Sequence, residues 1–209
     1  MWALIEDGSI TKTINNPKAM VIGDTQYSRN IFSSRWTNAE REAIGIYEIV
    51  FNNTKKKDEA YYINTNQTFT YDADAGTVTA TYGDATAKAH ADTLFTEDDE
   101  DDGLGTEGDV KVEGLKTKLI RTVKVQAAGI LQDTDWYIVR KADADTDVPS
   151  AITTFRAAVR TKGAAMETLI TNASNTPAIE TLYTYVNTAD EGDPVVMERP
   201  LGVFPVLGS

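Results

Sequence analysis

The chain has 209 residues, a length that suits one large or two small domains. Hydrophobic residues make up 41% and charged residues 25%, close to ordinary globular proteins, so a buried core is expected. Lysine and arginine total 20 against 32 acidic residues, and the net charge of -12 argues against nucleic acid as the main partner. Because the chain has no cysteine, a disulfide framework and a thiolate metal site are excluded.

Neither a membrane span nor a signal peptide is predicted. No apolar run approaches the roughly 20 residues that a membrane helix needs. The first residues, from Met1 to Asp7, have no basic start and reach acidic residues early. We therefore expect no membrane partner.

The first half of the chain has the pattern of β-hairpins. Trp2–Glu6 and Ser9–Ile14 are short apolar runs on either side of Asp7-Gly8, a two-residue hairpin signal. Residues 61–71 alternate and are rich in Thr, Tyr and Phe, and residues 77–82 return after a turn. This second pair is the clearest predicted hairpin.

One short helix interrupts these strands. Thr37 is a suitable N-cap with Glu40 three residues later, and Gly45 ends the helix after Ile44. Residues 46–51 then predict a strand. The fold class predicted is α+β, with a β-rich antiparallel domain over residues 1–96 followed by a helical domain.

Residues 97–108 predict an acidic, glycine-containing linker. Asp98, Glu100 and Asp102 take the first, third and fifth positions of a twelve-residue calcium loop, with Gly103 sixth and Asp109 twelfth. These four acidic residues are candidate Ca²⁺ ligands. The twelfth residue is shorter than the usual glutamate, and no helix is predicted before the loop, so a solvated acidic linker is the alternative.

Residues 109–188 predict a helical domain, and residues 189–209 an extended tail with prolines. Apolar residues at helical spacing form the face of a long first helix: Val112, Leu115, Leu119, Val123, Ala127 and Ile130. Thr134 can cap a second helix through Asp143. Pro149 suits the first turn of a third helix, whose face is Ile152, Phe155, Val159, Met166 and Ile170. A fourth helix begins at Thr176-Pro177, with Ile179, Leu182, Tyr183 and Val186 inward.

Trp136 is predicted to be the main core anchor of the second helix, packed between the first and third helices. Arg140, Arg156 and Arg160 are candidates for ion pairs with Asp133 or Asp135 that would hold the helices together. Asp135 alternatively lies in the first turn, where it favours the helix dipole. Each of these roles is structural.

No pattern predicts catalysis or a cofactor. His90 is the only histidine, and no nucleophile, zincin or phosphate-loop motif is present, so we expect no enzyme and no catalytic residues. Five aromatic residues of the β half would form either core or a sugar-stacking face: Tyr61, Tyr62, Phe69, Tyr71 and Tyr82.

The stretch from Leu131 through Thr134-Asp-Trp-Tyr-Ile-Val-Arg140, then Val148-Pro149, then Phe155-Arg-Ala-Ala-Val-Arg160 resembles a helical module of bacteriophage tail-fibre assembly and related tail-associated proteins. Trp36-Thr37, Glu40 and residues 43–47 are similar to a stretch near the start of many such proteins. The residues that carry the module are Thr134, Asp135, Trp136, Arg140, Pro149, Phe155, Arg156 and Arg160.

The resemblance implies a structural, non-enzymatic component of the virion tail or tail-fibre attachment region, present in the host cytoplasm during assembly. Its partners would be other tail or fibre proteins, in a homo- or hetero-oligomer. The alternatives are an assembly chaperone that is absent from the mature particle and a glycan-binding receptor module.

Overall fold

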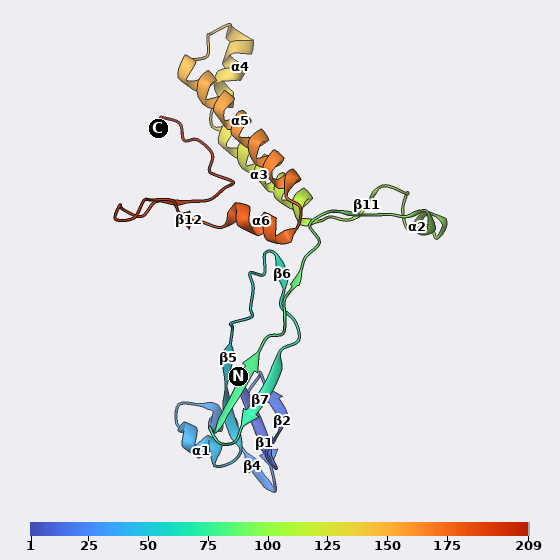
Figure 1. The fold of residues 1–209 in the computed structure, drawn as a ribbon, viewed down its shortest axis with the longest axis vertical. Coiled ribbons are helices and arrows are strands. Elements are labelled where there is room, and N and C mark those ends of the chain that lie inside the picture. The colour runs from blue at the N-terminus through green and yellow to red at the C-terminus, as the bar shows by residue number, and fades with distance from the viewer. Residues whose placement is uncertain (209) are drawn as a thin grey trace. The chain divides into compact units, whose positions relative to one another are not determined.

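The computed structural model describes residues 1–208, and the chain divides into two compact units, Met1–Thr86 and the part from Ala87 onward. A β-rich first half and helices in the second confirm the predicted α+β class (Figure 1). The boundary lies at residue 86 rather than 96. The reason is that Ala89 and His90 accept hydrogen bonds from the backbone of Leu115 and Lys116, which ties this segment to the second unit.

The elements of the first unit are those predicted, with additional short ones. They are β1 (Trp2–Glu6), β2 (Ser9–Ile14), β3 (Met20–Ile22), β4 (Thr25–Tyr27), the 3₁₀ helix η1 (Arg29–Phe32), α1 (Asn38–Glu42), β5 (Ile46–Asn52), β6 (Tyr62–Ile63), β7 (Thr68–Asp72) and β8 (Thr77–Thr81), with β9 (Thr86–Ala87) at the boundary. The main sheet has the order β2-β1-β5-β8-β7.

The sheet is mixed, whereas an antiparallel one was predicted. The β1–β2 and β7–β8 hairpins and the β1–β5 pair are antiparallel, but β5 pairs with β8 in parallel. The second strand of the β7–β8 hairpin, rather than the first, lies next to β5, and this reverses the direction of pairing. The hairpin itself is confirmed, with Asp72 opposite Thr77, although its first strand begins at Thr68 rather than residue 61.

Arg41 organises one end of the first unit. The capping box of Thr37 and Glu40 starts α1 as predicted. Arg41 is buried, and its Nη1 donates to the carbonyl oxygens of Ile31, Ser33 and Trp36, at 2.7 Å for Trp36. Its guanidinium lies 4.5 Å from the centre of the Trp2 ring. One arginine therefore links η1, α1 and β1.

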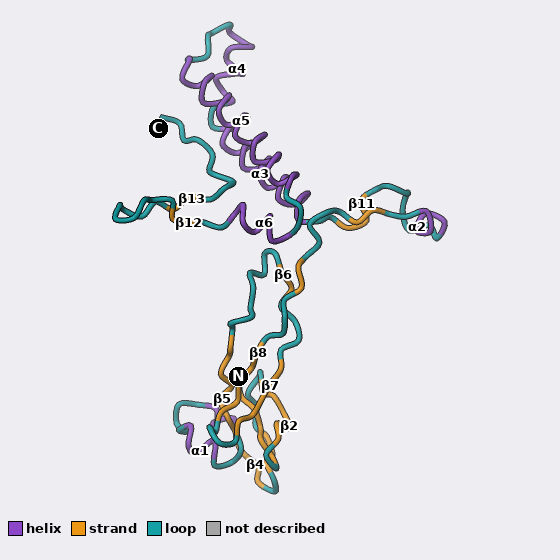
Figure 2. Tube along the Cα trace, in the orientation of Figure 1, coloured by secondary structure: helices purple, strands orange, loops and turns teal. Residues whose placement is uncertain are grey.

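The second unit contains the long helices. They are α3 (Leu115–Gln132), α4 (Asp135–Ala144), α5 (Ser150–Asn172) and α6 (Thr176–Tyr183). α3 and α5 run side by side, and α4 lies at the far end of the pair (Figures 1 and 2). The core between them consists of Val123, Met166, Ile170 and Leu201, with Leu119, Leu182 and Phe204 packed against it. The predicted faces of the first, third and fourth helices are confirmed at these positions. Val112 and Val186 were predicted inward, but both are exposed in short strands.

The acidic segment is an ordered hairpin arm rather than a plain linker. β10 (Thr93–Leu94) pairs with β11 (Val110–Val112), and α2 (Glu97–Asp101) lies between them. Thr96 caps α2 in a reciprocal pair of hydrogen bonds with Asp99, and Lys111 pairs with Asp99 at 2.6 Å. We call residues 93–112 the acidic arm, which projects from the start of α3 (Figure 1).

The C-terminal segment is not simply an extended tail. β12 (Val186–Asn187) pairs with β13 (Met197–Glu198). The chain then returns to the helices, where Leu201 is 2% exposed and its backbone N–H donates to the Leu182 carbonyl at 3.0 Å. Phe204 packs against Gly163 of α5. The apolar run of residues 201–207 was the signal in the sequence for this docking.

Candidate protein-interaction surface

The turn between α3 and α4 is fixed by one buried arginine of α5. Arg156 is 7% exposed, and its Nη1 donates to the Leu131 carbonyl at 2.8 Å and to the Thr134 hydroxyl at 2.7 Å. The same atom lies 2.8 Å from a carboxylate oxygen of Asp135, so the predicted ion pair between Arg156 and Asp135 is confirmed. A carbonyl, a hydroxyl and a carboxylate of one turn are therefore all bound by the same guanidinium.

The roles of Thr134 and Pro149 at the helix ends differ slightly from those predicted. Thr134 is the N-cap residue of α4, but its side chain makes no cap bond and instead donates to the Leu131 carbonyl. Thr134 is 2% exposed, and its hydroxyl already bonds to Leu131 and Arg156. Pro149 is the N-cap of α5 rather than a residue of its first turn, and its carbonyl accepts from Ile152 and Thr153.

Trp136 is not the core anchor that its size predicted, because it is 55% exposed. None of the ten residues of α4 is buried. Ile138 and Val139 are 43% and 65% exposed. The buried side chain at the turn between α3 and α4 is instead Arg156 of α5. The apolar side chains of α4 therefore face solvent.

Trp136 belongs instead to a stack of side chains along α4. The Arg140 guanidinium carbon lies 4.5 Å from the centre of the Trp136 ring and 5.5 Å from that of Tyr137. The two rings are 5.1 Å apart. The Nε of Arg140 is buried and has no hydrogen-bond partner within residues 1–208. A ring–guanidinium stack that is half exposed is typical of residues that dominate binding at protein interfaces.

An apolar groove lies beside the start of α4. Phe155 of α5 and the segment Pro205–Leu207 line two adjoining hollows of about 350 and 440 Å³. Thr134 lies at the edge of the smaller one, which places the groove beside the start of α4. Val206 and Leu207 are 70% and 47% exposed. We call the exposed side chains of α4 together with this groove the α4 surface.

The loop after α4 is held by charge. Lys141 lies 2.8 Å from carboxylate oxygens of both Asp145 and Asp147. The hydrogen bond to Asp145 and then that to Asp147 raise the pKa of Lys141, and the lysine lowers the pKa of Asp147. Arg160, the third predicted arginine, is exposed on α5 and forms no ion pair within the described chain.

The predicted calcium ligands do not form a site. Across residues 1–208, no three acidic or histidine side chains are placed to hold a metal ion. Asp98, Glu100 and Asp102 lie on or next to α2, where residues two apart point to opposite sides of the helix. Asp109 lies across the arm, where its carbonyl accepts from Phe95. The acidic run forms a capped helix, and a calcium loop would require it to wrap around an ion.

The aromatic residues of the first unit are largely core. Tyr61 and Tyr62 are buried, and Phe69 and Tyr71 pack against the cluster of Ala3, Ile49, Val78 and Ala80. They therefore do not present a stacking face for a sugar. His90 is half-buried at the base of the acidic arm and interacts there through its backbone carbonyl.

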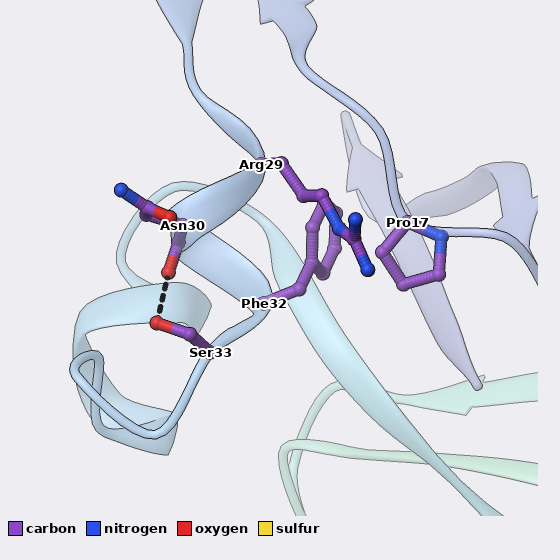
Figure 3. Close-up of a pocket in the computed structure, with 5 residues that line it drawn as sticks. All are labelled: Pro17, Arg29, Asn30, Phe32 and Ser33. Atoms are coloured by element: carbon purple, nitrogen blue, oxygen red, sulfur yellow. Dashed lines mark hydrogen bonds between the residues drawn. The ribbon is translucent and has the colours of Figure 1, made fainter.

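A separate hollow of about 370 Å³ lies in the first unit next to η1. Figure 3 shows it lined by Pro17, Arg29, Asn30, Phe32 and Ser33, with the Ser33 hydroxyl hydrogen-bonded to the Asn30 carbonyl. Arg29 is the one ionisable side chain among them. The hollow is open, and its lining places no carboxylate or histidine beside the Ser33 hydroxyl.

Comparison with protein families, with curated proteins and with solved structures finds no match for this chain. None of the helices within residues 1–208 combines the length and the apolar character needed to cross a membrane.

Proposed function

We propose that this protein is a non-enzymatic structural component of a bacteriophage tail, and that it works through protein–protein contacts made by the α4 surface. The observation that carries the proposal is α4 itself. A helix of ten residues is marginal in water without packing, yet α4 has no buried residue and exposes Trp136, Ile138 and Val139. Such a helix is expected to be covered by a partner in its working state.

The total accessible surface supports the same reading. The chain exposes 13574 Å². Two separate compact domains of the lengths of its two units would together expose about 11,500 Å². The excess, about 2,000 Å², is more than the roughly 800 Å² that each partner buries in a standard protein–protein interface. Surface of this extent is typical of a subunit that completes its packing within an assembly.

The assignment to a phage tail depends on the resemblance of residues 131–160 to tail-associated proteins. The residues of that module hold the helices in place: Arg156 and Thr134 fix the turn, and Pro149 starts α5. They support a binding surface and bring no catalytic group to it. A transient assembly chaperone would use the same surface, and its absence from the particle would distinguish it.

The experiment is complementation of a phage that lacks the gene. Trp136→Glu with Val139→Glu places two charges on the α4 surface, where solvent exposure allows the chain to fold. We expect the variant to match the parent in circular dichroism but to be missing from particles. The matched control is Val21→Glu with Val50→Glu, at exposed positions of the first unit. Normal incorporation of the α4 variant would contradict the proposal.

A further inference from the structure

The second unit carries opposite charges on two of its parts. The acidic arm, residues 93–112, has eight acidic residues and one basic residue, Lys111. α3 has four basic residues and no acidic one: Lys116, Lys118, Arg121 and Lys124. In a chain of net charge -12, a helix free of acidic residues is a local exception.

The acidic arm also exposes apolar side chains. Leu94, Leu104, Val110 and Val112 are 47%, 60%, 46% and 58% exposed. A two-stranded hairpin has no second layer and is marginally stable alone in water. Its base is fixed, because Asp92 accepts hydrogen bonds from the Gly114 backbone at 2.6 Å and from the Thr117 hydroxyl at 2.7 Å. The arm is therefore held at one end, and its sides lack a covering.

The outward face of α3 has the complementary character. Lys118, Arg121 and Val125 are exposed and lie three, four and seven residues apart, which places them on one side of the helix. Val125 is 66% exposed. Gly129 continues the same side, and a side chain placed there would meet no atom within 4 Å. The face is basic at its start, where Arg121 also pairs with Glu113 of its own chain, and it is apolar and open beyond that point.

We infer that the acidic arm of one copy packs on the outward face of α3 of a second copy of this chain. Carboxylates of α2 lie against Lys118 and Arg121, and the apolar residues of the arm cover Val125. The two surfaces differ, so the contact closes into a reciprocal dimer when each copy receives the other's arm, and otherwise repeats into a ring or a filament. This inference rests on the proposed assembly role and names one of its partners.

The test is sedimentation of the full chain over a range of concentration and salt. We expect the parent chain to associate, and the association to weaken as salt rises, because exposed opposite charges are screened. Asp98→Lys with Asp101→Lys reverses the arm at positions outside its capping box, and Lys118→Glu with Arg121→Glu reverses α3. Each pair should raise the dissociation constant about 100-fold, because like charges across an interface are strongly unfavourable.

The two reversed chains give a sharper result when combined. Mixed in equal amounts, the normal arm of one chain can meet the normal α3 face of the other, and the reversed arm can meet the reversed face with opposite charges again. The mixture should therefore associate, although neither chain does so alone. Both reversals in one chain should restore association. The matched controls are Lys12→Glu with Lys18→Glu and Asp24→Lys with Asp74→Lys, which change the net charge equally on the first unit and should leave association intact.

A parent chain that stays monomeric would overturn the inference, and so would association that neither reversal weakens. In both cases the proposed role of the α4 surface is unaffected, because it is tested separately by the incorporation of the α4 variant into particles. Loss of association in the two control variants as well would show a general effect of charge and would also overturn it.

Discussion

Arg156 of α5 donates a hydrogen bond to the hydroxyl of Thr134 at 2.7 Å, although 22 residues separate them in the chain. The bond joins the N-cap of α4 to the third long helix and sets where α4 begins. It also explains why Trp136 lies outside: the interior position beside the turn belongs to an arginine with three acceptors.

Thr134→Val should reduce the free energy of unfolding by about 1.5–3 kcal/mol, because it removes an acceptor from a buried guanidinium. Chemical denaturation of the second unit measures this. Thr168→Val is the matched control: its hydroxyl is exposed on α5 and bonds within its own helix, so a change within about 0.5 kcal/mol is expected. Equal effects of the two substitutions would show that the bond to Arg156 contributes nothing.

Trp136→Ala should cost less than about 1 kcal/mol in the isolated chain, because the ring is 55% exposed. From the sequence alone, a buried tryptophan would lose about 3–5 kcal/mol. Thermal or denaturant unfolding distinguishes the two values. A large loss would mean that α4 packs inward in solution, and it would remove the basis for the α4 surface.

The two tryptophan expectations show where sequence reasoning succeeds and where it stops. The periodicity of α3 and α5 predicted Val123, Val159, Met166 and Ile170 as buried, and they are. Helical periodicity predicts one apolar face for each helix and assumes that this face is buried. α4 is short, and its apolar side chains are exposed. The pattern therefore could not say that Arg156 would take the interior place.

In the first unit and the acidic segment, too, local signals in the sequence predicted the structure and long-range choices could not be predicted. The Thr37–Glu40 capping box is a local signal, and the structure has it. The parallel pairing of β5 with β8 depends on which strand of a hairpin lies next to β5, and no local signal encodes that choice. The acidic run matched a calcium loop in spacing alone, whereas Thr96 and Asp99 form a capping box that favours a helix.

Leu201→Ala should destabilise the second unit by about 2–5 kcal/mol, since it removes a side chain that is 2% exposed and packed against Val123 and Met166. Val206→Ala is the control, because Val206 is 70% exposed. Denaturant unfolding of both variants measures the difference. If Leu201→Ala proves as mild as Val206→Ala, the C-terminal segment does not dock on the helices.

Tyr47 should ionise at unusually high pH. Its hydroxyl and that of Tyr71 are 3.2 Å apart, and this hydrogen bond, with burial, raises the pKa of Tyr47 to about 12. Because the folded-state pKa lies above the unfolded value near 10, the contribution to stability is present below about pH 10. It is lost as the pH rises toward 12.

Ultraviolet titration of tyrosinate, compared between the parent and Tyr47→Phe, tests this. The substitution should remove a late-ionising group. Tyr137→Phe is the control, because Tyr137 belongs to α4 of the second unit and is not part of this hydrogen-bonded pair. An unchanged titration at high pH in Tyr47→Phe would refute the assignment.

The most direct measurement of the proposed role is quantitative mass spectrometry of purified particles of the proposed source, a phage whose genome carries the gene for this chain. We predict that the protein is present in the particle in a fixed ratio to a known tail protein, and that the ratio survives a salt wash. A particle that contains every other tail protein but lacks this chain would contradict a structural role and would leave the transient chaperone as the better account.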